Sequence, residues 1–441
     1  MTGGRRPCIV VLIRSFGFPE GMAATHRVRL LGRALLEQGI DVTVLCTRVS
    51  ERPGEIINRH TRGVCDGIPF RYATSSTLRS PSFVVRRCEE VRGFLVALQE
   101  LTSRRCARRL DCVYVAEVSM SWWPNLWLLR RALALLGVPV IAELNELPGA
   151  ATWLPASLSR RLSHLSGVAG VTAISASLAE WATLEARRIG RSIEIIEVPI
   201  VIDVGEQDLT PYLHGEPMFV YSASNAYSEV AAFIFRAMRL VWERYPQCSV
   251  TVTGMRADMV ARMAKSEGLD AEIADGRIVI AGFVDRDRLI ELYRAAAALL
   301  IPLADDDVSR ARFPTKVGEY LASARPVVTT DVGEISRFLK DGETAYVARR
   351  GAVADYAAKL MDVLDDPERA ARVGLAGRQL CTEDFLFSRQ GPPLARLIER
   401  VAGQGGARSG GGEACACDRV SAGARRLFDV ARHRPDGGRI S

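Results

Sequence analysis

The run from residue 313 to residue 330 constrains the fold of this chain more than any other segment, because it joins a helix directly to a buried strand. Pro314 suits the first turn of a helix, where its missing N–H would have no partner in any case. Good helix formers continue to Ala324, and Arg325-Pro326 then ends the helix. The residues that follow, Pro-Val-Val-Thr-Thr, are typical of a parallel strand buried on both faces. The segment therefore predicts an α/β unit.

Apolar runs and helical patterns alternate along the whole chain, which predicts two α/β units with mostly parallel sheets. Expected strands cover residues 8–13, 40–46, 112–118, 138–144, 168–174, 195–203 and 218–221, and expected helices include 22–38 and 83–110. We expect an N-terminal domain over 1–203, a linker with two prolines over 204–217 and a second domain over 218–382. An amphipathic helix over 383–402 and a glycine-rich, disordered tail over 403–441 complete the predicted organisation.

The predicted helix start in the 313–330 run offers bare N–H groups and the positive end of a helix dipole to an anion. Lys316 lies in the first turn, and Glu319, three residues later, lies on the same face. An ammonium group beside a carboxylate suits a nucleoside diphosphate, with the cation on phosphate and the carboxylate on ribose hydroxyls. An ordinary surface Lys–Glu pair fits the spacing equally well. Only four of the 58 basic residues are lysines, at positions 265, 316, 340 and 359, so a lysine here is unusual for this chain.

The pattern Phe-Pro-Thr-Lys-x-x-Glu-Tyr-Leu-Ala-Ser-x-x-Pro-Val-Val-x-Thr resembles the donor-site signature of glycosyltransferase family 4. Residues 281–285, 331–335 and 341–345 are similar to the base-contacting loop, the glycine loop and a later turn of that family. The resemblance extends over residues 8–400 and is most specific over 281–347. It implies the GT-B fold, in which two Rossmann-like parallel-sheet domains face a cleft and a C-terminal helix crosses back.

The resemblance also implies which residues bind the nucleotide-sugar donor. Gly282 and Phe283 would contact the base, and Glu319 would contact the ribose. The diphosphate would lie near Lys316 and Gly333, and the same block includes Arg312 and Glu334.

Two segments of the first domain are candidates for contact with the sugar. The loop that follows the first strand lies where α/β sheets bind ligands, and Gly21 within it resembles the key glycine of the family. We expect Arg27, at the start of the next helix, to project toward a phosphate or an acceptor carboxylate. Asn145 and Glu146 follow the 138–144 strand, where the family has a histidine, and could contact the sugar, orient the acceptor or cap a turn.

The sequence departs from the family pattern at two points. Ala311 stands where most members have the first of two acidic residues, although a branch with the FP-x-K block also lacks that residue. The opening loop of the second domain, residues 221–229, has none of the expected cations. Stabilisation of the departing diphosphate would then depend on Lys316, Arg310 and Arg312. The predicted catalytic residues are Asn145, Glu146 and Lys316.

The predicted function is transfer of a sugar, with retention, from a nucleotide-sugar to an acceptor hydroxyl on a glycan, a lipid-linked molecule or a small molecule. Two alternatives remain: a catalytically silent GT-B partner subunit, and a nucleotide-sugar epimerase of the same fold. The resemblance implies no cofactor and no metal, and the acidic run 305–307 is interpreted as a solvated loop.

Charge and composition bear on the location of the protein. The hydrophobic fraction of 48% and charged fraction of 25% are typical of soluble globular proteins, and the ten scattered cysteines predict reduced thiols. Arg130-Arg131 interrupts the most apolar stretch, so no membrane span is expected.

Residues 1–200 contain 26 Lys+Arg against 17 Asp+Glu, a net +9. This suits a cytoplasmic protein with either a solvated surface or a peripheral contact at the anionic inner membrane face. Basic and aromatic residues do not interleave, which disfavours nucleic acid.

Overall fold

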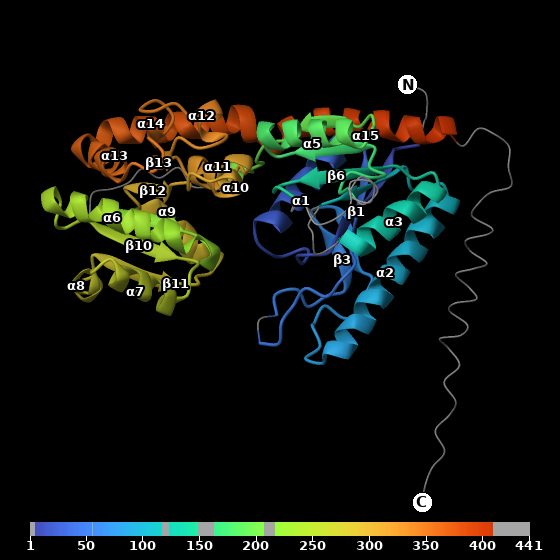
Figure 1. Cartoon of the computed structure of the whole chain (residues 1–441), viewed down its shortest axis with the longest axis horizontal. Coiled ribbons are helices and arrows are strands. Elements are labelled where there is room, and N and C mark those ends of the chain that lie inside the picture. The colour runs from blue at the N-terminus through green and yellow to red at the C-terminus, as the bar shows by residue number, and fades with distance from the viewer. Residues whose placement is uncertain (1–4, 55, 117–122, 149–162, 207–216, 409–441) are drawn as a thin grey trace, which may run out of the picture. The chain divides into compact units, whose positions relative to one another are not determined.

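The computed structural model describes residues 5–54, 56–116, 123–148, 163–206 and 217–408 and divides the chain into two α/β units (Figure 1). Unit 1 comprises residues 1–173, 179–197 and 391–441, and unit 2 comprises residues 174–178 and 198–390. The two predicted units are present, but the chain passes between them four times, whereas the predicted linker and crossover helix imply two passages.

Unit 1 is built on an eight-stranded sheet in the order β3-β4-β2-β1-β5-β6-β7-β8. Its strands are β1 (Cys8–Ile13), β2 (Asp41–Cys46), β3 (Arg62–Cys65), β4 (Ile68–Tyr72), β5 (Cys112–Val115), β6 (Val140–Leu144), β7 (Gly170–Ala173) and β8 (Glu194–Glu197). Its helices are α1 (Ala23–Glu37), α2 (Phe83–Cys106), α3 (Trp123–Leu135), most of α5 (Ala176–Arg188) and most of α15 (Phe387–Arg408). The chain moves outward from β1 in both directions, first to β2 and later to β5, so the carboxyl end of β1 is a topological switch point.

One edge of this sheet departs from the parallel arrangement. β3 and β4 form an antiparallel hairpin whose two-residue loop is Asp66-Gly67. Both loop residues have positive φ, at 50° and 77°, as the type I′ turn requires. An Asp-Gly pair adopts that conformation readily, which explains the hairpin locally.

Unit 2 has a six-stranded sheet, parallel throughout, in the order β11-β10-β9-β12-β13-β14. Its strands are β9 (Met218–Ser222), β10 (Ser249–Thr253), β11 (Ile278–Gly282), β12 (Ala298–Ile301), β13 (Val327–Thr330) and β14 (Tyr346–Ala348). Its helices are α6 (Ser228–Arg244), α7 (Ala257–Ser266), α8 (Asp270–Ala274), α9 (Arg286–Ala295), α10 (Asp307–Ala311), α11 (Thr315–Ala322), α12 (Ile335–Phe338), α13 (Val353–Asp365) and α14 (Pro367–Leu380).

The core of unit 2 lies between its sheet and the helices α6, α7 and α13. Phe235, Val260 and Tyr356 represent these three helices in one cluster of buried side chains. The connections through α9 and α11 run across the sheet in the opposite direction to those through α6 and α7. Because such crossovers are right-handed, α9 and α11 lie on the face opposite to α6 and α7. Both faces of the sheet are covered, which explains the unbroken apolar runs of its strands.

Several boundaries differ from those predicted. The strand expected over 195–203 ends at Glu197, because Pro199 has no N–H for the ladder. The N–H of Ile202 instead donates to the carbonyl oxygen of Phe385 at 2.9 Å, which ties this segment to unit 2. The helix expected over 83–110 ends at Cys106.

The C-terminal helix differs as well. Residues 381–385 form a short separate turn before α15, and residues 403–408, expected to be disordered, continue that helix. Residues 207–216 of the predicted linker and 409–441 of the predicted tail lie outside the described residues. Within the part of the chain that is described, no helix has the length and apolar character needed to cross a membrane.

Candidate functional site

The carboxyl edge of the sheet in unit 2 gathers most of the predicted donor residues. β9 and β12 are neighbours there, and the chain leaves them in opposite directions, which makes this edge a switch point of the kind where α/β sheets bind ligands. The Tyr320 hydroxyl in α11 accepts the N–H of Ser222 at 3.0 Å, so α11 is tied to the end of β9. The helix predicted from the 313–330 run therefore begins at the switch point.

Lys316 and Glu319 are paired at this edge, as their spacing predicts. The Lys316 Nζ lies 3.2 Å from the Glu319 Oε2 and donates to the Tyr293 hydroxyl at 3.0 Å. The Tyr293 ring packs edge-on against Tyr320 with centroids 5.1 Å apart. Burial raises the pKa of Tyr293, and the nearby Glu319 adds to the effect, so this hydroxyl stays protonated. The Lys316 and Glu319 side chains keep 29% and 23% of their surface exposed, which leaves both accessible to a ligand.

Arg312 brings a guanidinium to the loop that follows β9. Its Nη1 donates to the Tyr227 hydroxyl at 2.9 Å, and its guanidinium carbon lies 5.8 Å from the centre of that ring. The loop itself contains no cation between Tyr221 and Glu229. The positive charge that this segment lacks is thus provided by a residue from the loop before α11.

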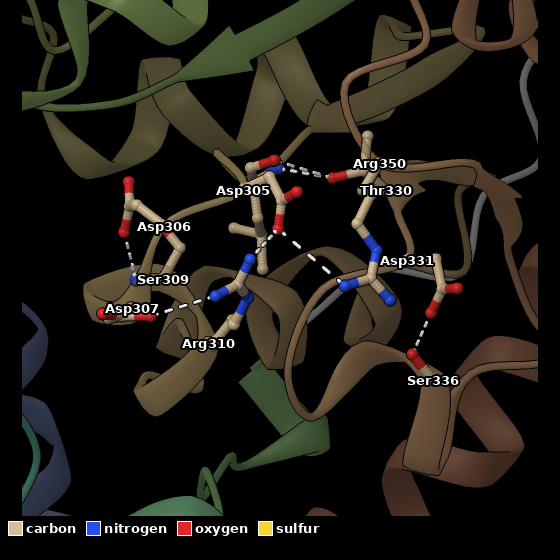
Figure 2. Close-up of polar contacts among 10 residues, drawn as sticks. Asp305, Asp306, Asp307, Ser309, Arg310, Thr330, Asp331, Ser336 and Arg350 are labelled. Carbon is tan, nitrogen blue, oxygen red and sulfur yellow. Dashed lines mark hydrogen bonds and ion pairs between the residues drawn. The ribbon is translucent and has the colours of Figure 1, made fainter.

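Arg310, in contrast, is held by the acidic loop in front of α10 (Figure 2). Its guanidinium pairs with Asp305 at 2.6 Å and with Asp307 at 3.0 Å, and Arg350 approaches Asp305 at 3.8 Å. Asp306 accepts the N–H of Ser309 at 2.7 Å and caps the helix. All three aspartates have partners, and no group of three or more His, Cys, Asp or Glu in the described residues could hold a metal ion.

Gly333 and Glu334 lie in the turn between β13 and α12. Gly333 has φ +59°, and a Cβ there would lie 2.7 Å from the carbonyl oxygen of Arg310, so only glycine fits without a shift. The Glu334 side chain is 5% exposed, and its carboxylate accepts the N–H of Ala176 at 2.8 Å and pairs with Arg337 at 3.2 Å. Glu334 therefore caps the start of α5 inside unit 2.

The predicted base-contacting loop follows β11. Gly282 has φ +63°, and its carbonyl oxygen accepts from the Gly254 N–H and from the Thr253 hydroxyl, both at 2.8 Å. These bonds fix the carboxyl ends of β10 and β11 to each other. The Phe283 ring next to them is 71% exposed, which is unusual for a phenylalanine and leaves its face open for stacking.

The other four predicted residues lie in unit 1, and one of them is placed differently from the prediction. Gly21 lies in the exposed loop before α1. Arg27 does not project from the helix start: its side chain is 2% exposed, and its Nε donates to the Glu143 Oε1 in β6 at 2.7 Å. A buried guanidinium needs such a partner, and Glu143 is itself 1% exposed. Arg27 is therefore a buried ion-pair partner in unit 1.

Asn145 and Glu146 follow β6 directly, as the sequence predicts. The Glu146 side chain is exposed, whereas the Asn145 Oδ1 is buried and has no hydrogen-bond partner among the described residues. A buried amide oxygen without a partner is uncommon in folded proteins and is explained when a ligand donates to it. The structure thus adds a physical reason to consider Asn145.

Sequence patterns alone assign no role to Tyr227 and Tyr293, although each contacts one of the predicted cations. Tyr227 lies in the opening loop of the second domain, and Tyr293 follows the predicted base-contacting loop. An aromatic residue is a weak signal there, because many tyrosines pack in cores. Their importance comes from the tertiary contacts with Arg312 and Lys316.

Comparisons with known proteins agree with this geometry. Residues 216–366 match the family model described as glycosyl transferases group 1. A D-inositol 3-phosphate glycosyltransferase of Nocardia farcinica is 35% identical over 89 residues, which are 20% of this chain and 19% of that protein. A 2-deoxystreptamine glucosyltransferase of Streptomyces kanamyceticus is 24% identical over 306 residues, which are 62% of this chain and 75% of that protein.

Among solved structures, Anabaena HepE in complex with UDP and glucose matches with a TM-score of 0.61 and 13% identity, covering 89% of this chain and 99% of HepE. At this identity the likeness concerns the fold, and it confirms the predicted GT-B class of two parallel-sheet α/β domains. The residues that match the glycosyl transferases group 1 model lie in unit 2.

Proposed function

We propose that this protein is a retaining glycosyltransferase of family 4 that moves a sugar from a nucleotide-sugar to an acceptor hydroxyl. The observation that carries the proposal is the cluster of Lys316, Glu319 and Tyr293 at the switch point of unit 2, inside the group 1 domain. The names of the two sequence relatives and the UDP and glucose bound to HepE support a nucleotide-sugar donor.

In this proposal the cations of unit 2 stabilise the leaving group. When the bond between the sugar and the nucleotide breaks, negative charge grows on the diphosphate, and donors fixed in advance lower the barrier most effectively. Lys316 is fixed by Tyr293, and Arg312 is fixed by Tyr227. Glu319 would accept from the ribose hydroxyls, and the exposed Phe283 ring would stack on the base. Residues Gly21, Asn145 and Glu146 of unit 1 would contact the sugar, and no metal is needed for these steps.

The missing first glutamate has a local explanation. The Ala311 side chain is 1% exposed, and its carbonyl oxygen accepts from the Ser175 hydroxyl at 2.6 Å. A carboxylate at this position would be buried next to a carbonyl group and would need a cation to offset its desolvation. The nucleotide can therefore depend on Glu319 alone, as in the branch of the family that this chain resembles.

The alternatives differ in what they require. A silent partner subunit would follow if no cation reached the loop after β9, and the contact between Arg312 and Tyr227 argues against that. An epimerase would need groups that remove and return a proton or a nucleotide at the sugar, and the residues proposed to contact the sugar include one carboxylate, Glu146, and no histidine.

Purified protein incubated with a panel of nucleotide-sugars tests the proposal, with hydrolysis and transfer followed by mass spectrometry. Lys316→Ala should reduce turnover by about 10²- to 10³-fold, comparable to the loss of one oxyanion-type donor. Lys359→Ala is the matched control, because that lysine is also ion-paired, to Asp341 at 2.6 Å, and its side chain is 20% exposed. Donor binding without turnover by the wild type, across a broad acceptor panel, would identify a silent subunit instead.

Nucleotide binding gives a second, independent measurement. Glu319→Gln should weaken binding of UDP or GDP by about 1–3 kcal/mol, the scale of a lost charged hydrogen bond, as measured by calorimetry. Glu267→Gln serves as control, since Glu267 pairs with Arg236 at 2.8 Å and has a similarly small exposed fraction of 19%. Equal affinities of the Glu319 variant and the wild type would exclude the ribose assignment.

The location proposed for the enzyme is the cytoplasm, with peripheral contact at the anionic inner membrane face. Three consecutive apolar residues at the start of α2, Phe83, Val84 and Val85, are 60%, 68% and 44% exposed. Arg86 and Arg87 follow them directly, and apolar side chains next to cations suit an anionic lipid surface. Liposomes with anionic lipid should sediment the protein at low salt, and about 0.5 M salt should release it. Equal recovery with neutral liposomes would contradict the electrostatic contact.

A further inference from the structure

A cavity of about 300 Å³ opens in unit 1, and none of the residues proposed to bind the nucleotide-sugar lines it. It lies at the carboxyl edge of the sheet, because its walls include Arg14, Arg48 and Thr74, which follow the ends of β1, β2 and β4 within two residues. Five arginines line it: Arg14, Arg48, Arg52, Arg79 and Arg86. Two glutamates, Glu89 and Glu90 of α2, are the acidic residues of the lining, so its positive charges outnumber its negative charges by three.

The negative charge of Glu90 is divided among several cations. Its carboxylate lies 3.9 Å from Arg14 and 2.7 Å from Arg87, and it also pairs with Arg48. Burial, followed by repulsion from Arg48, lowers the pKa of Arg14 to about 10. The part of this shift that comes from Arg48 and Arg87 shows that other cations lie close to Arg14 at the cavity.

Arg86 is fixed at the cavity by neutral groups. Its Nη1 donates to the carbonyl oxygen of Ser80 at 3.1 Å and to that of Pro81 at 2.6 Å. These carbonyl groups hold the side chain in place without cancelling its charge. Ser15 and Ser50 add hydroxyl groups to the same lining.

We propose that this cavity binds a phosphate group of the acceptor, and hence that the acceptor is a phosphate ester. Guanidinium groups that converge from several strand ends match the oxygens of a phosphate, which accept paired hydrogen bonds from arginine. The volume is about ten times that of one water molecule in the liquid, so the cavity has room for more than the phosphate alone. The carboxyl edge of a parallel sheet is also where α/β units bind ligands.

The identification of the bound phosphate ester as the acceptor rests on the proposed transfer reaction. The cavity and its charge do not depend on that reaction. The phosphate could belong to a water-soluble ester or to a lipid headgroup. The residues proposed to bind the nucleotide all lie in unit 2, so substitutions in this cavity separate the two sites.

Titration of the full-length protein with inorganic phosphate, followed by calorimetry, is the first test. The wild type should bind phosphate, and the affinity should fall as salt rises. Arg48→Gln and Arg86→Gln should each weaken binding about tenfold or more, whereas Arg48→Lys should retain part of it. Arg104→Gln is the matched control: Arg104 is 28% exposed and paired with Glu100 on the same helix, and Arg48 is 30% exposed.

The second test distinguishes the two sources of phosphate. Vesicles of phosphatidylcholine with and without phosphatidic acid are sedimented with the wild type and with Arg48→Gln. Recovery on phosphatidic acid vesicles that is lost in Arg48→Gln assigns the cavity to a lipid phosphate. Arg48-dependent phosphate binding together with equal vesicle recovery of the wild type and Arg48→Gln assigns it to a soluble ester.

The inference is overturned if the wild type binds neither phosphate nor phosphatidic acid vesicles, or if Arg48→Gln, Arg86→Gln and Arg104→Gln all bind like the wild type. Calorimetry with UDP and a thermal melt check that each variant is folded. Wild-type protein that binds phosphate in an Arg48-dependent manner but neither hydrolyses nor transfers from any nucleotide-sugar, across the acceptor panel, would remove the transferase proposal and leave the anion site intact.

Discussion

The Nζ of Lys316 lies 3.0 Å from the hydroxyl oxygen of Tyr293, although 23 residues separate the two in the chain. The lysine comes from the first turn of α11 and the tyrosine from the last turn of α9, so the contact joins two helices on one face of the sheet in unit 2. It fixes a mobile cation in front of the switch point, where the diphosphate is proposed to bind.

Removal of this hydroxyl tests its role. Tyr293→Phe should weaken nucleotide binding by about 0.5–1.5 kcal/mol, because Lys316 loses a hydrogen bond that orients it. Tyr346→Phe is the control, since the buried Tyr346 hydroxyl has no hydrogen-bond partner among the described residues. Calorimetry with UDP and GDP compares the two variants, and an equal loss in both would argue against orientation by Tyr293.

Gly333 should be intolerant of any side chain. Gly333→Ala requires both a positive φ and a Cβ that would lie 2.7 Å from the Arg310 carbonyl oxygen. Gly276→Ala also requires a positive φ, of 85°, but its Cβ would meet no atom within 4 Å. Chemical unfolding should show a cost of about 1–2 kcal/mol for Gly276→Ala from the backbone conformation alone, and a larger cost for Gly333→Ala. Equal costs would mean that the loop shifts to accept the methyl group.

The buried pair of Arg27 and Glu143 should matter for stability. Arg27→Met leaves the Glu143 carboxylate buried without its cation and should reduce the free energy of unfolding by about 3–5 kcal/mol. The double variant Arg27→Met/Glu143→Leu should recover much of that loss, because both charges are then absent. Arg71→Met, which breaks an exposed pair with Glu100 at 3.2 Å, should cost less than about 1 kcal/mol. Urea unfolding measures all three, and a double variant no more stable than Arg27→Met would contradict the electrostatic explanation.

Low pH should reduce the folding stability of unit 1, because the Glu51 carboxylate becomes protonated. Burial raises the pKa of this carboxyl group, but hydrogen bonds from Ser50, Asn58 and the backbone N–H of Ile57 outweigh burial and hold the pKa below its usual value. A lowered pKa in the folded state means that the stabilisation is present above the unfolded-state pKa of about 4.3 and is lost as pH falls through the folded-state value.

Unfolding measured along a pH series tests this sign. The difference in unfolding free energy between the wild type and Glu51→Gln should be constant above about pH 5 and should shrink as the pH falls below it. Glu146→Gln, at an exposed position, is the comparison variant. A difference that grows toward low pH would show that the sign of the shift is reversed.

The sequence predicted the elements around the donor site well, because local patterns determine them. Pro314 and the Arg325-Pro326 pair delimit α11 closely, and the apolar run after them forms β13. Lys316 and Glu319 are three residues apart on one helix, so their pairing follows from helical geometry alone. The strand predicted over residues 195–203 is too long, because the apolar run continues past Pro199, which has no N–H for the ladder.

Tertiary structure alone decided the partners of Arg27, Arg312 and Arg48. Each is an arginine next to a predicted helix or strand, and the sequence gives no way to tell a buried ion pair from a ligand-binding cation. Their partners, Glu143, Tyr227 and Glu90, are distant in the chain, at separations of 116, 85 and 42 residues. Local sequence determines helices and strands through backbone preferences and periodicity, whereas burial and charge pairing depend on which segments the completed sheets bring together.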